Sequence, residues 1–391
     1  MSGIARLRDY RGPIFLSNGF RPFFLFGAIY AGLAVLAWLP MFDGELKLWT
    51  DFSPVDWHVH EMLYGYLPAV VTGFLLTAIP NWTGRLPLQG LPLLVLVSVW
   101  VAGRVAVTLS AETGWLLAAI IDVSFLALVV AATSREIIVG KNWRNLRVVG
   151  LVTFLLAGNI AFHIEAHVHG TAEYGTRMGI AAIVMLIVVI GGRIVPSFTR
   201  NWLARENPGR LPAPFARFDT AVIGITAAAL LLWTVQPIGR LTAAALAITG
   251  GLNILRLARW AGDRTYRDRL VLILHVGYAF LPLGFLLAGA AALDIIVTSA
   301  GIHAWTVGAA GTMTLAVMTR ASLGHTGNAL TASPGTQTIY AAVVLAGLAR
   351  ICASLEPGWS DGLLHVTAFA WCVAFFGFAL FFGPMLAGRT R

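Results

Sequence analysis

The chain has 391 residues, of which 58 % are hydrophobic and only 12 % are charged, and its formal net charge is +9 at pH 7. A soluble domain carries roughly 25 % charged residues, so this composition excludes an ordinary soluble protein and predicts an all-α integral membrane protein. The positive charge does not indicate nucleic acid as a partner, because in a membrane protein the distribution of Lys and Arg matters more than their total. We therefore expect the protein to be surrounded by membrane lipid.

Twelve apolar segments follow one another along the chain. A helix needs about 20 apolar residues to cross a bilayer. Runs of that kind lie near 22–40, 58–80, 89–109, 115–138, 147–169, 175–198, 217–235, 238–258, 270–292, 300–319, 336–355 and 362–386. No small-residue cleavage site follows the Arg-rich N-terminus, so the first run is expected to be a span and not a signal peptide. We therefore expect a single polytopic membrane domain over residues 1–391.

Lys and Arg gather at alternate connections between these segments. The basic ends include both termini, with Arg6, Arg8, Arg11 and Arg21 at one and Arg389 and Arg391 at the other. The odd connections are mostly acidic, as at Asp43, Glu45 and Asp51. The positive-inside rule therefore predicts that both termini lie in the cytoplasm.

With that topology, most of the nine histidines fall at the outer ends of spans. They are His58 and His60 in the second span, His163, His167 and His169 in the fifth, His303 in the tenth and His365 in the twelfth. Imidazole is the commonest metal ligand and suits copper, iron and zinc. One interfacial histidine more often hydrogen-bonds at headgroup level, but so many on one side favour a metal centre or a haem in the outer half.

The sequence also indicates how a haem would be bound and which residues would hold a metal. The sequence contains no Cys-x-x-Cys-His, so a haem is expected to be bound non-covalently, as in b-type haems. The candidate metal ligands are His58, His60, His163, His167, His303 and His365. His163 and His167 are four residues apart and share one helix face, an arrangement that lets two imidazoles converge on copper, with His365 as a third ligand. The alternative is that the pair only hydrogen-bonds Glu61 or the headgroups.

Ionisable groups within or beside the spans are the next candidates, because they are costly in a bilayer. Glu61 and Glu165 are expected to orient ligating histidines and to deliver protons, although solvated interfacial acids remain an equal alternative. Arg104 is expected to pair with one of them or with a haem propionate. Asp122 stands alone in the fourth span and is a candidate for a proton relay from the inner side.

Three spans end alike on the cytoplasmic side. The segments are "AIPNWTGR" at 78–85, "IVPSFTRNW" at 194–202 and "VMTRASLGHTG" at 317–327. Their threonines, Thr83, Thr199 and Thr319, close the second, sixth and tenth spans, which is one element every four helices. This period predicts three pseudo-symmetric units of four helices. Chance recurrence of helix-ending residues is the competing explanation.

Longer stretches of the chain resemble the NnrS family. They are "FRPFFLFGAIYAGLAVLAWLP" at 20–40, "WHVHEMLYGYLPAVVTGFLLTAIPNWTGR" at 57–85, "RIVPSFTRNW" at 193–202 and "MTRASLGHTGNAL" at 318–330. The resemblance covers almost the whole chain. It implies a protein of the bacterial inner membrane that carries haem and copper and belongs to the nitric oxide response of denitrifying and related bacteria. The sequence does not identify an electron donor.

The predicted architecture is also similar to the catalytic subunit of haem–copper oxidases and nitric oxide reductases. In that superfamily the second and tenth spans hold haem ligands, which here are His58 or His60 and His303. The tenth span has one histidine where that pattern needs two, and an adjacent His-His copper pair is missing. We therefore expect a haem- and copper-binding protein that binds, reduces or detoxifies nitric oxide. A secondary transporter, or a metal or nitric oxide sensor without turnover, is the alternative.

Overall fold

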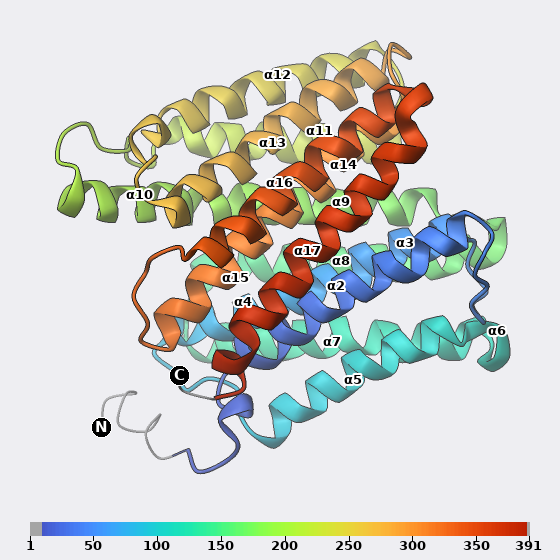
Figure 1. Cartoon of the computed structure of the whole chain (residues 1–391), viewed down its shortest axis with the longest axis horizontal. Coiled ribbons are helices and arrows are strands. Elements are labelled where there is room, and N and C mark those ends of the chain that lie inside the picture. The colour runs from blue at the N-terminus through green and yellow to red at the C-terminus, as the bar shows by residue number, and fades with distance from the viewer. Residues whose placement is uncertain (1–9, 389–391) are drawn as a thin grey trace. The chain divides into compact units, whose positions relative to one another are not determined.

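The computed structural model describes residues 10–388, and every regular element in that range is a helix (Figure 1). This confirms the predicted all-α fold for the described residues; Arg6, Arg8, Arg389 and Arg391 lie outside them. The chain divides into two compact units. The first runs to Gly179 and includes the segment from Phe378 onward, and the second is Ile180–Gly377.

The first unit holds the N-terminal helices. Its elements are η1 (Ile14–Leu16), α2 (Phe20–Phe42), α3 (Pro54–His60), η2 (Glu61–Tyr66), α4 (Leu67–Thr83), α5 (Leu91–Thr108), α6 (Ser110–Thr113), α7 (Trp115–Val139), η3 (Trp143–Asn145), α8 (Leu146–His169), the first half of α9 (Glu173–Leu186) and the last part of α17 (Ser360–Leu386).

The second unit holds the remaining helices. After α9 come η4 (Ile187–Gly191), α10 (Gly192–Glu206), α11 (Arg217–Val235), α12 (Arg240–Ala258), η5 (Gly262–Arg264), α13 (Arg269–Ala291), α14 (Thr298–His303), η6 (Ala304–Gly311), α15 (Thr312–His325), α16 (Pro334–Leu355), η7 (Pro357–Trp359) and most of α17.

Local sequence explains where several helices begin and end. Ser53 accepts a hydrogen bond from the Asp56 backbone N–H at 3.1 Å, and Pro54 occupies the first turn, where its missing N–H costs nothing. Ser333 caps α16 in the same way. At the other end, Gly84 closes α4 with a φ of 69°, a left-handed conformation that glycine adopts without strain.

Among the described residues, eleven helices are long and apolar enough to cross a membrane, by length and composition. This is the pattern of a multi-pass membrane protein. The tenth run expected from the sequence, 300–319, falls in the continuous helix formed by α14, η6 and α15, which is not among the eleven. That helix is roughly 40 Å long at 1.5 Å per residue, but many of its residues are Gly and Thr, which lower its mean hydropathy.

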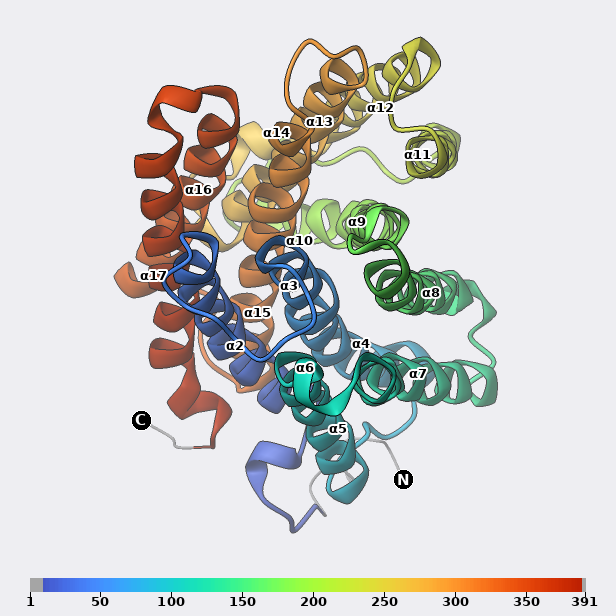
Figure 2. The ribbon, with the colours of Figure 1, turned by 90° about the vertical axis from the view of Figure 1, so that its right-hand side faces the viewer.

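The packing of the first unit creates a polar centre between helices. Helix α7 packs against both α5 and α8, and α4 packs against α2 and α7 (Figure 2). In the second unit, α13 is the central helix and contacts α12, α14, η6 and α15. Glycines on α13 permit these close contacts, because a Cβ at Gly277 would lie 3.1 Å from Met313. Small residues at helix interfaces are typical of membrane bundles.

The three helices that carry Thr83, Thr199 and Thr319 share a second feature. Each contains a π-helical segment, which is η2 in the first, η4 in the second and η6 in the third. Each threonine hydroxyl also donates to a backbone carbonyl three or four residues earlier, those of Ile79, Val195 and Ala316. Since π-helical turns are rare and often lie at functional sites, these three helices are candidates to carry a functional site.

Candidate metal centre

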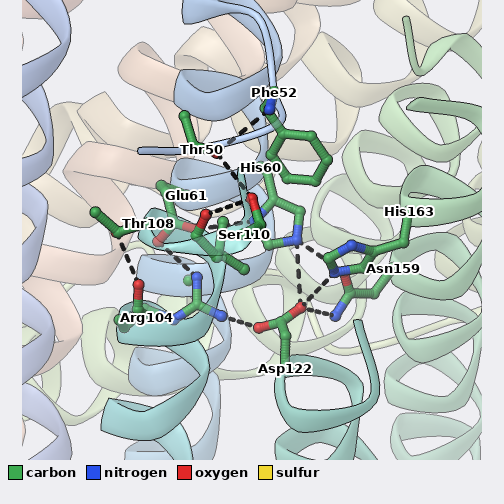
Figure 3. A network of polar contacts seen from close by, with 12 residues as sticks. Thr50, Phe52, His60, Glu61, Arg104, Thr108, Ser110, Asp122, Asn159 and His163 are labelled. Carbon is green, nitrogen blue, oxygen red and sulfur yellow. Dashed lines mark hydrogen bonds and ion pairs between the residues drawn. The ribbon is translucent and has the colours of Figure 1, made fainter. Parts of the chain in front are cut away.

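A buried polar cluster lies between the helices of the first unit, at the junction of α3 and η2 (Figure 3). We call it the polar cluster. Its members are Tyr30 on α2, His60 on α3, Glu61 on η2, Arg104 on α5, Asp122 on α7, and Asn159 and His163 on α8. All except the partly buried Tyr30 are buried, with His60, Glu61 and Asn159 completely shielded from solvent.

His60 uses both of its ring nitrogens within the cluster. Its Nδ1 lies 2.9 Å from Glu61 Oε1, and a carboxylate can only accept, so this contact places a proton on Nδ1. Its Nε2 faces Asn159 Oδ1 at 3.1 Å and Asp122 Oδ2 at 3.3 Å. Glu61 thereby fixes the ring orientation and directs Nε2 toward Asp122.

Asp122 joins α7 to α8 through one oxygen. Asp122 Oδ2 lies 3.0 Å from His163 Nε2 and accepts a 2.8 Å hydrogen bond from Asn159 Nδ2. One carboxylate oxygen of Asp122 and one ring nitrogen each of His60 and His163 lie within 4.8 Å of one another. Two imidazoles and a carboxylate therefore converge on a single point from α3, α7 and α8.

Arg104 neutralises part of the negative charge. Its NH1 donates to Glu61 Oε2 at 2.6 Å, and its NH2 donates to Asp122 Oδ1. The Tyr30 hydroxyl donates to Glu61 Oε2 as well. The guanidinium thus connects the two carboxylates, as its planar set of donors allows, and leaves Asp122 Oδ2 to the histidines.

Aromatic rings and glycines shape the walls of the cluster. The Phe52 ring lies 5.2 Å from the His60 ring and 5.5 Å from that of His163, measured between centroids, and Phe162 lies 5.2 Å from His60. These rings reduce contact with water, which strengthens the electrostatic interactions inside. Gly103 permits the approach of α7, because a Cβ there would lie 3.1 Å from Asp122 Oδ1.

The arrangement is suited to a metal cation. Glu61 and Asp122 carry two negative charges and Arg104 one positive charge, so the cluster has one negative charge in excess when both histidines are neutral. Buried charge without compensation is costly. Imidazole nitrogens and carboxylate oxygens are ligands that first-row transition metals use.

The structure brings together four of the predicted site residues, which are His60, Glu61, Arg104 and His163. Arg104 pairs with Glu61, one of the two carboxylates expected for it. The predicted pair His163 and His167 does not form one site. His163 is buried in the cluster, whereas His167 is exposed and its ring stacks on that of Trp115 at a centroid distance of 4.1 Å.

Two other predicted residues of the first unit make different contacts. The His58 ring stacks on Trp38 at a centroid distance of 4.1 Å. Glu165 accepts hydrogen bonds from the backbone N–H groups of Tyr174 and Gly175 at 3.1 and 2.7 Å. These groups belong to the first turn of α9, where a negative charge is stabilised by the helix dipole.

His303 and His365 belong to the second unit. The Nδ1 of His303 lies 2.7 Å from the Ser299 carbonyl oxygen, and the Nδ1 of His365 lies 3.0 Å from the Asp361 carbonyl oxygen. A carbonyl can only accept, so both rings carry a proton on Nδ1. Nε2 is then the donor atom toward a metal, as in many ligating histidines.

Three members of the cluster were not among the predicted site residues. Asp122 was expected to act only as an isolated proton relay, and no role was predicted for Asn159 or Tyr30. A carboxylate alone in an apolar span is itself a signal of function, so Asp122 could have been included. Nothing in the sequence distinguishes Tyr30 from other tyrosines in apolar helices.

Comparison with known proteins identifies the family. None of the curated proteins matches the chain. A family model described as NnrS protein matches residues 14–389, which is nearly the whole chain. The match confirms the resemblance expected from the sequence motifs: the chain belongs to the NnrS family.

Proposed function

We propose that this membrane protein binds haem and copper and acts on nitric oxide by binding, reducing or detoxifying it, and so protects bacteria from nitrosative stress. Membership of the NnrS family supports the link to nitric oxide. The observation that carries the proposal is the convergence of His60, Asp122 and His163, three metal-ligating side chains buried within a membrane protein. A buried group of this kind is costly to maintain without a ligand or a function.

Haem is the first expected cofactor, and His303 fits the role of an axial ligand. Its Nδ1 donates to the Ser299 carbonyl, which holds the ring in the tautomer whose Nε2 bears the lone pair. The ring is part-buried and comes directly before the π-helical segment η6. When bound, the haem would supply an iron centre for a small neutral gas.

Copper is the second expected cofactor, and the polar cluster fits it through two imidazoles. The side chains around this site orient the ligands, carry a proton and exclude water. Glu61 accepts from His60, Arg104 and Tyr30, so it can orient the ligand ring and take part in proton transfer. Phe52 and Phe162 limit the access of water. Reduction of nitric oxide would also need an electron donor outside this chain.

The proposed topology has twelve spans in the bacterial inner membrane, with both termini in the cytoplasm. Eleven of these are the apolar helices, and the remaining one is the helix from Thr298 to His325. The three π-helical segments, on the helices that carry Thr83, Thr199 and Thr319, support the proposal of three four-helix units related to the haem–copper oxidase pattern.

An optical spectrum of the detergent-purified protein, recorded with and without nitric oxide, tests this function. We expect a Soret band in the reduced protein that shifts on addition of nitric oxide, and copper in the metal analysis. A colourless preparation from cells supplied with iron, haem precursor and copper, with neither metal in stoichiometric amount, would overturn the proposal.

A further inference from the structure

We propose that His60, Asp122 and His163 are the ligands of one mononuclear first-row transition-metal ion, bound through two imidazole Nε2 atoms and one carboxylate oxygen. The site lies wholly within the first unit. It deepens the proposed function, on which it rests for the presence of a bound metal, and it assigns His60 to the ion and not to haem. Copper and ferrous iron share the chemistry of this donor set.

Hydrogen bonding around His60 is incomplete without a second positive charge. Three oxygen atoms face its two nitrogens, from Glu61 at 2.9 Å, Asn159 at 3.1 Å and Asp122 at 3.3 Å. A neutral imidazole has one N–H, and Glu61 takes it. The Asn159 amide cannot be turned to help, because its Nδ2 already donates to Asp122. Nε2 therefore meets oxygen lone pairs unless a proton or a metal ion lies there.

Asp122 Oδ2 favours the metal ion over the proton. Its nitrogen neighbours are Asn159 Nδ2 at 2.8 Å, His163 Nε2 at 3.0 Å and His60 Nε2 at 3.3 Å. A proton on His60 Nε2 would be shared between Asn159 Oδ1 at 3.1 Å and Asp122 Oδ2 at 3.3 Å, and Asp122 Oδ2 would then receive a third N–H. A metal ion bound to both Nε2 atoms is instead held by Asp122 Oδ2 directly, and Asn159 Nδ2 keeps its hydrogen bond to that oxygen.

The spacing of the three ligand atoms permits one shared metal ion, since all three lie within 4.8 Å of one another. Metal–nitrogen and metal–oxygen bonds are about 2.1 Å, so two ligands at right angles on one ion are separated by about 3 Å. The Asp122 oxygen lies 3.0 and 3.3 Å from the two Nε2 atoms. An ion placed on the common face of the three atoms therefore needs little movement of the ligands.

Partners around the ligands hold them in place. Glu61 fixes the His60 ring through Nδ1, and Arg104 holds the other oxygen of Asp122, Oδ1. Such outer partners are usual in metal sites, where they set the tautomer and the ligand orientation. Three protein ligands leave coordination positions open, as in the two-histidine, one-carboxylate sites of non-haem iron proteins. An open position permits a small ligand such as nitric oxide to bind the ion.

The test uses the full-length protein in detergent, stripped of metal with a chelator and titrated with Cu(II) under EPR. Wild type should bind one Cu(II) per chain, with superhyperfine coupling from two imidazole nitrogens. His60→Gln and His163→Gln should each lose one nitrogen coupling and weaken Cu(II) binding at least about tenfold. His167→Gln is the matched control on the same helix, and it should keep wild-type binding because His167 stacks on Trp115.

A parallel titration uses Fe(II) without oxygen, followed by nitric oxide. Because Cu(II) binds most nitrogen and oxygen sites more tightly than Fe(II), the two metals are distinguished by which one the protein contains as isolated and which one the His60→Gln and His163→Gln variants lose. The proposed site would be overturned if wild type bound neither ion, or if both histidine variants bound Cu(II) with the affinity and nitrogen couplings of wild type. The cluster would then be a structural ion network with a protonated His60. The wild-type measurement needs no variant, so misfolding of a variant cannot hide the result. The Soret band of the same preparations reports the proposed function separately.

Discussion

Arg104 lies directly against the backbone of Gly65, so that a Cβ added at Gly65 would fall 2.5 Å from Arg104 NH1 and 2.9 Å from Glu61 Oε2. Gly65 belongs to the π-helical segment η2, four residues after Glu61. The absence of a side chain at this one position therefore lets α5 present its guanidinium to Glu61. The relationship links an unusual helical turn to the charge balance of the polar cluster.

Substitution of Gly65 tests this relationship. In Gly65→Ala the guanidinium must move, but it is held by two carboxylates, so we expect a destabilisation of about 1–3 kcal/mol, typical of overpacking. Thermal unfolding in detergent measures it. Gly150→Ala is the control, because a Cβ at this position on α8 meets open space. A Gly65→Ala protein as stable as this control would show that the cluster tolerates the added methyl group.

Removal of the guanidinium should have a larger effect. Arg104→Gln leaves Glu61 and Asp122 as two buried carboxylates without their cation, and breaking a buried ion pair in this way costs about 3–5 kcal/mol. In the double variant Arg104→Gln with Glu61→Gln, part of the lost free energy of unfolding should be recovered, as measured by the same thermal unfolding. Arg135→Gln, which removes an exposed ion pair with Glu136, should change stability by less than about 1 kcal/mol. Equal effects of the two arginine substitutions would contradict the charge balance described above.

A second buried network, in the second unit, should also respond to the loss of one atom. Arg256 NH1 lies 3.1 Å from the Tyr278 hydroxyl, which itself donates to Asn253 Oδ1 at 2.9 Å. Tyr278→Phe leaves both partners buried with one contact fewer, at an expected cost of about 1–3 kcal/mol. Tyr266→Phe, at an exposed position, should have no measurable effect. Unchanged unfolding of the Tyr278 variant would mean that Arg256 and Asn253 find other partners.

The haem assignment makes its own prediction. His303→Ala should lower the haem content per chain, since loss of an axial ligand removes a direct bond to iron. His325→Ala, at the other end of the same continuous helix, should retain wild-type haem in a pyridine haemochrome assay. His60→Gln should retain it as well if His60 holds the ion. Normal haem in the His303 variant would remove that residue from the haem site.

The expected topology can be measured directly. A fluorescent protein fused after Arg391 should fluoresce in the cytoplasm, and alkaline phosphatase inserted near Gly44 should be active in the periplasm. The reason is the concentration of Lys and Arg at the even connections and both termini. Reporters in the same compartment would show that an even number of spans lies between them, and not the eleven expected from twelve spans.

The sequence by itself determined the helical fold, most of the helix boundaries and the family. Composition required membrane helices, and residues such as Ser53, Pro54 and Gly84 marked their ends through local capping that depends on few neighbours. The run 300–319 is the exception among the expected spans, because its Gly and Thr residues serve close packing and dilute its hydropathy. Four of the residues now in the polar cluster were also evident, because charged and imidazole groups are rare in apolar helices.

The tertiary structure alone decided how those residues combine. His163 and His167 share one helix face, yet one is buried beside Asp122 and the other stacks on Trp115 at the surface. Periodicity gives little help here, since in a membrane helix both the lipid-facing and the core-facing sides are apolar. Two of the three partners of His60, Asn159 and Asp122, lie about 60 to 100 residues further along the chain. Only the packing of α8 against α3, and of α7 against α4 and α8, brings them within bonding distance.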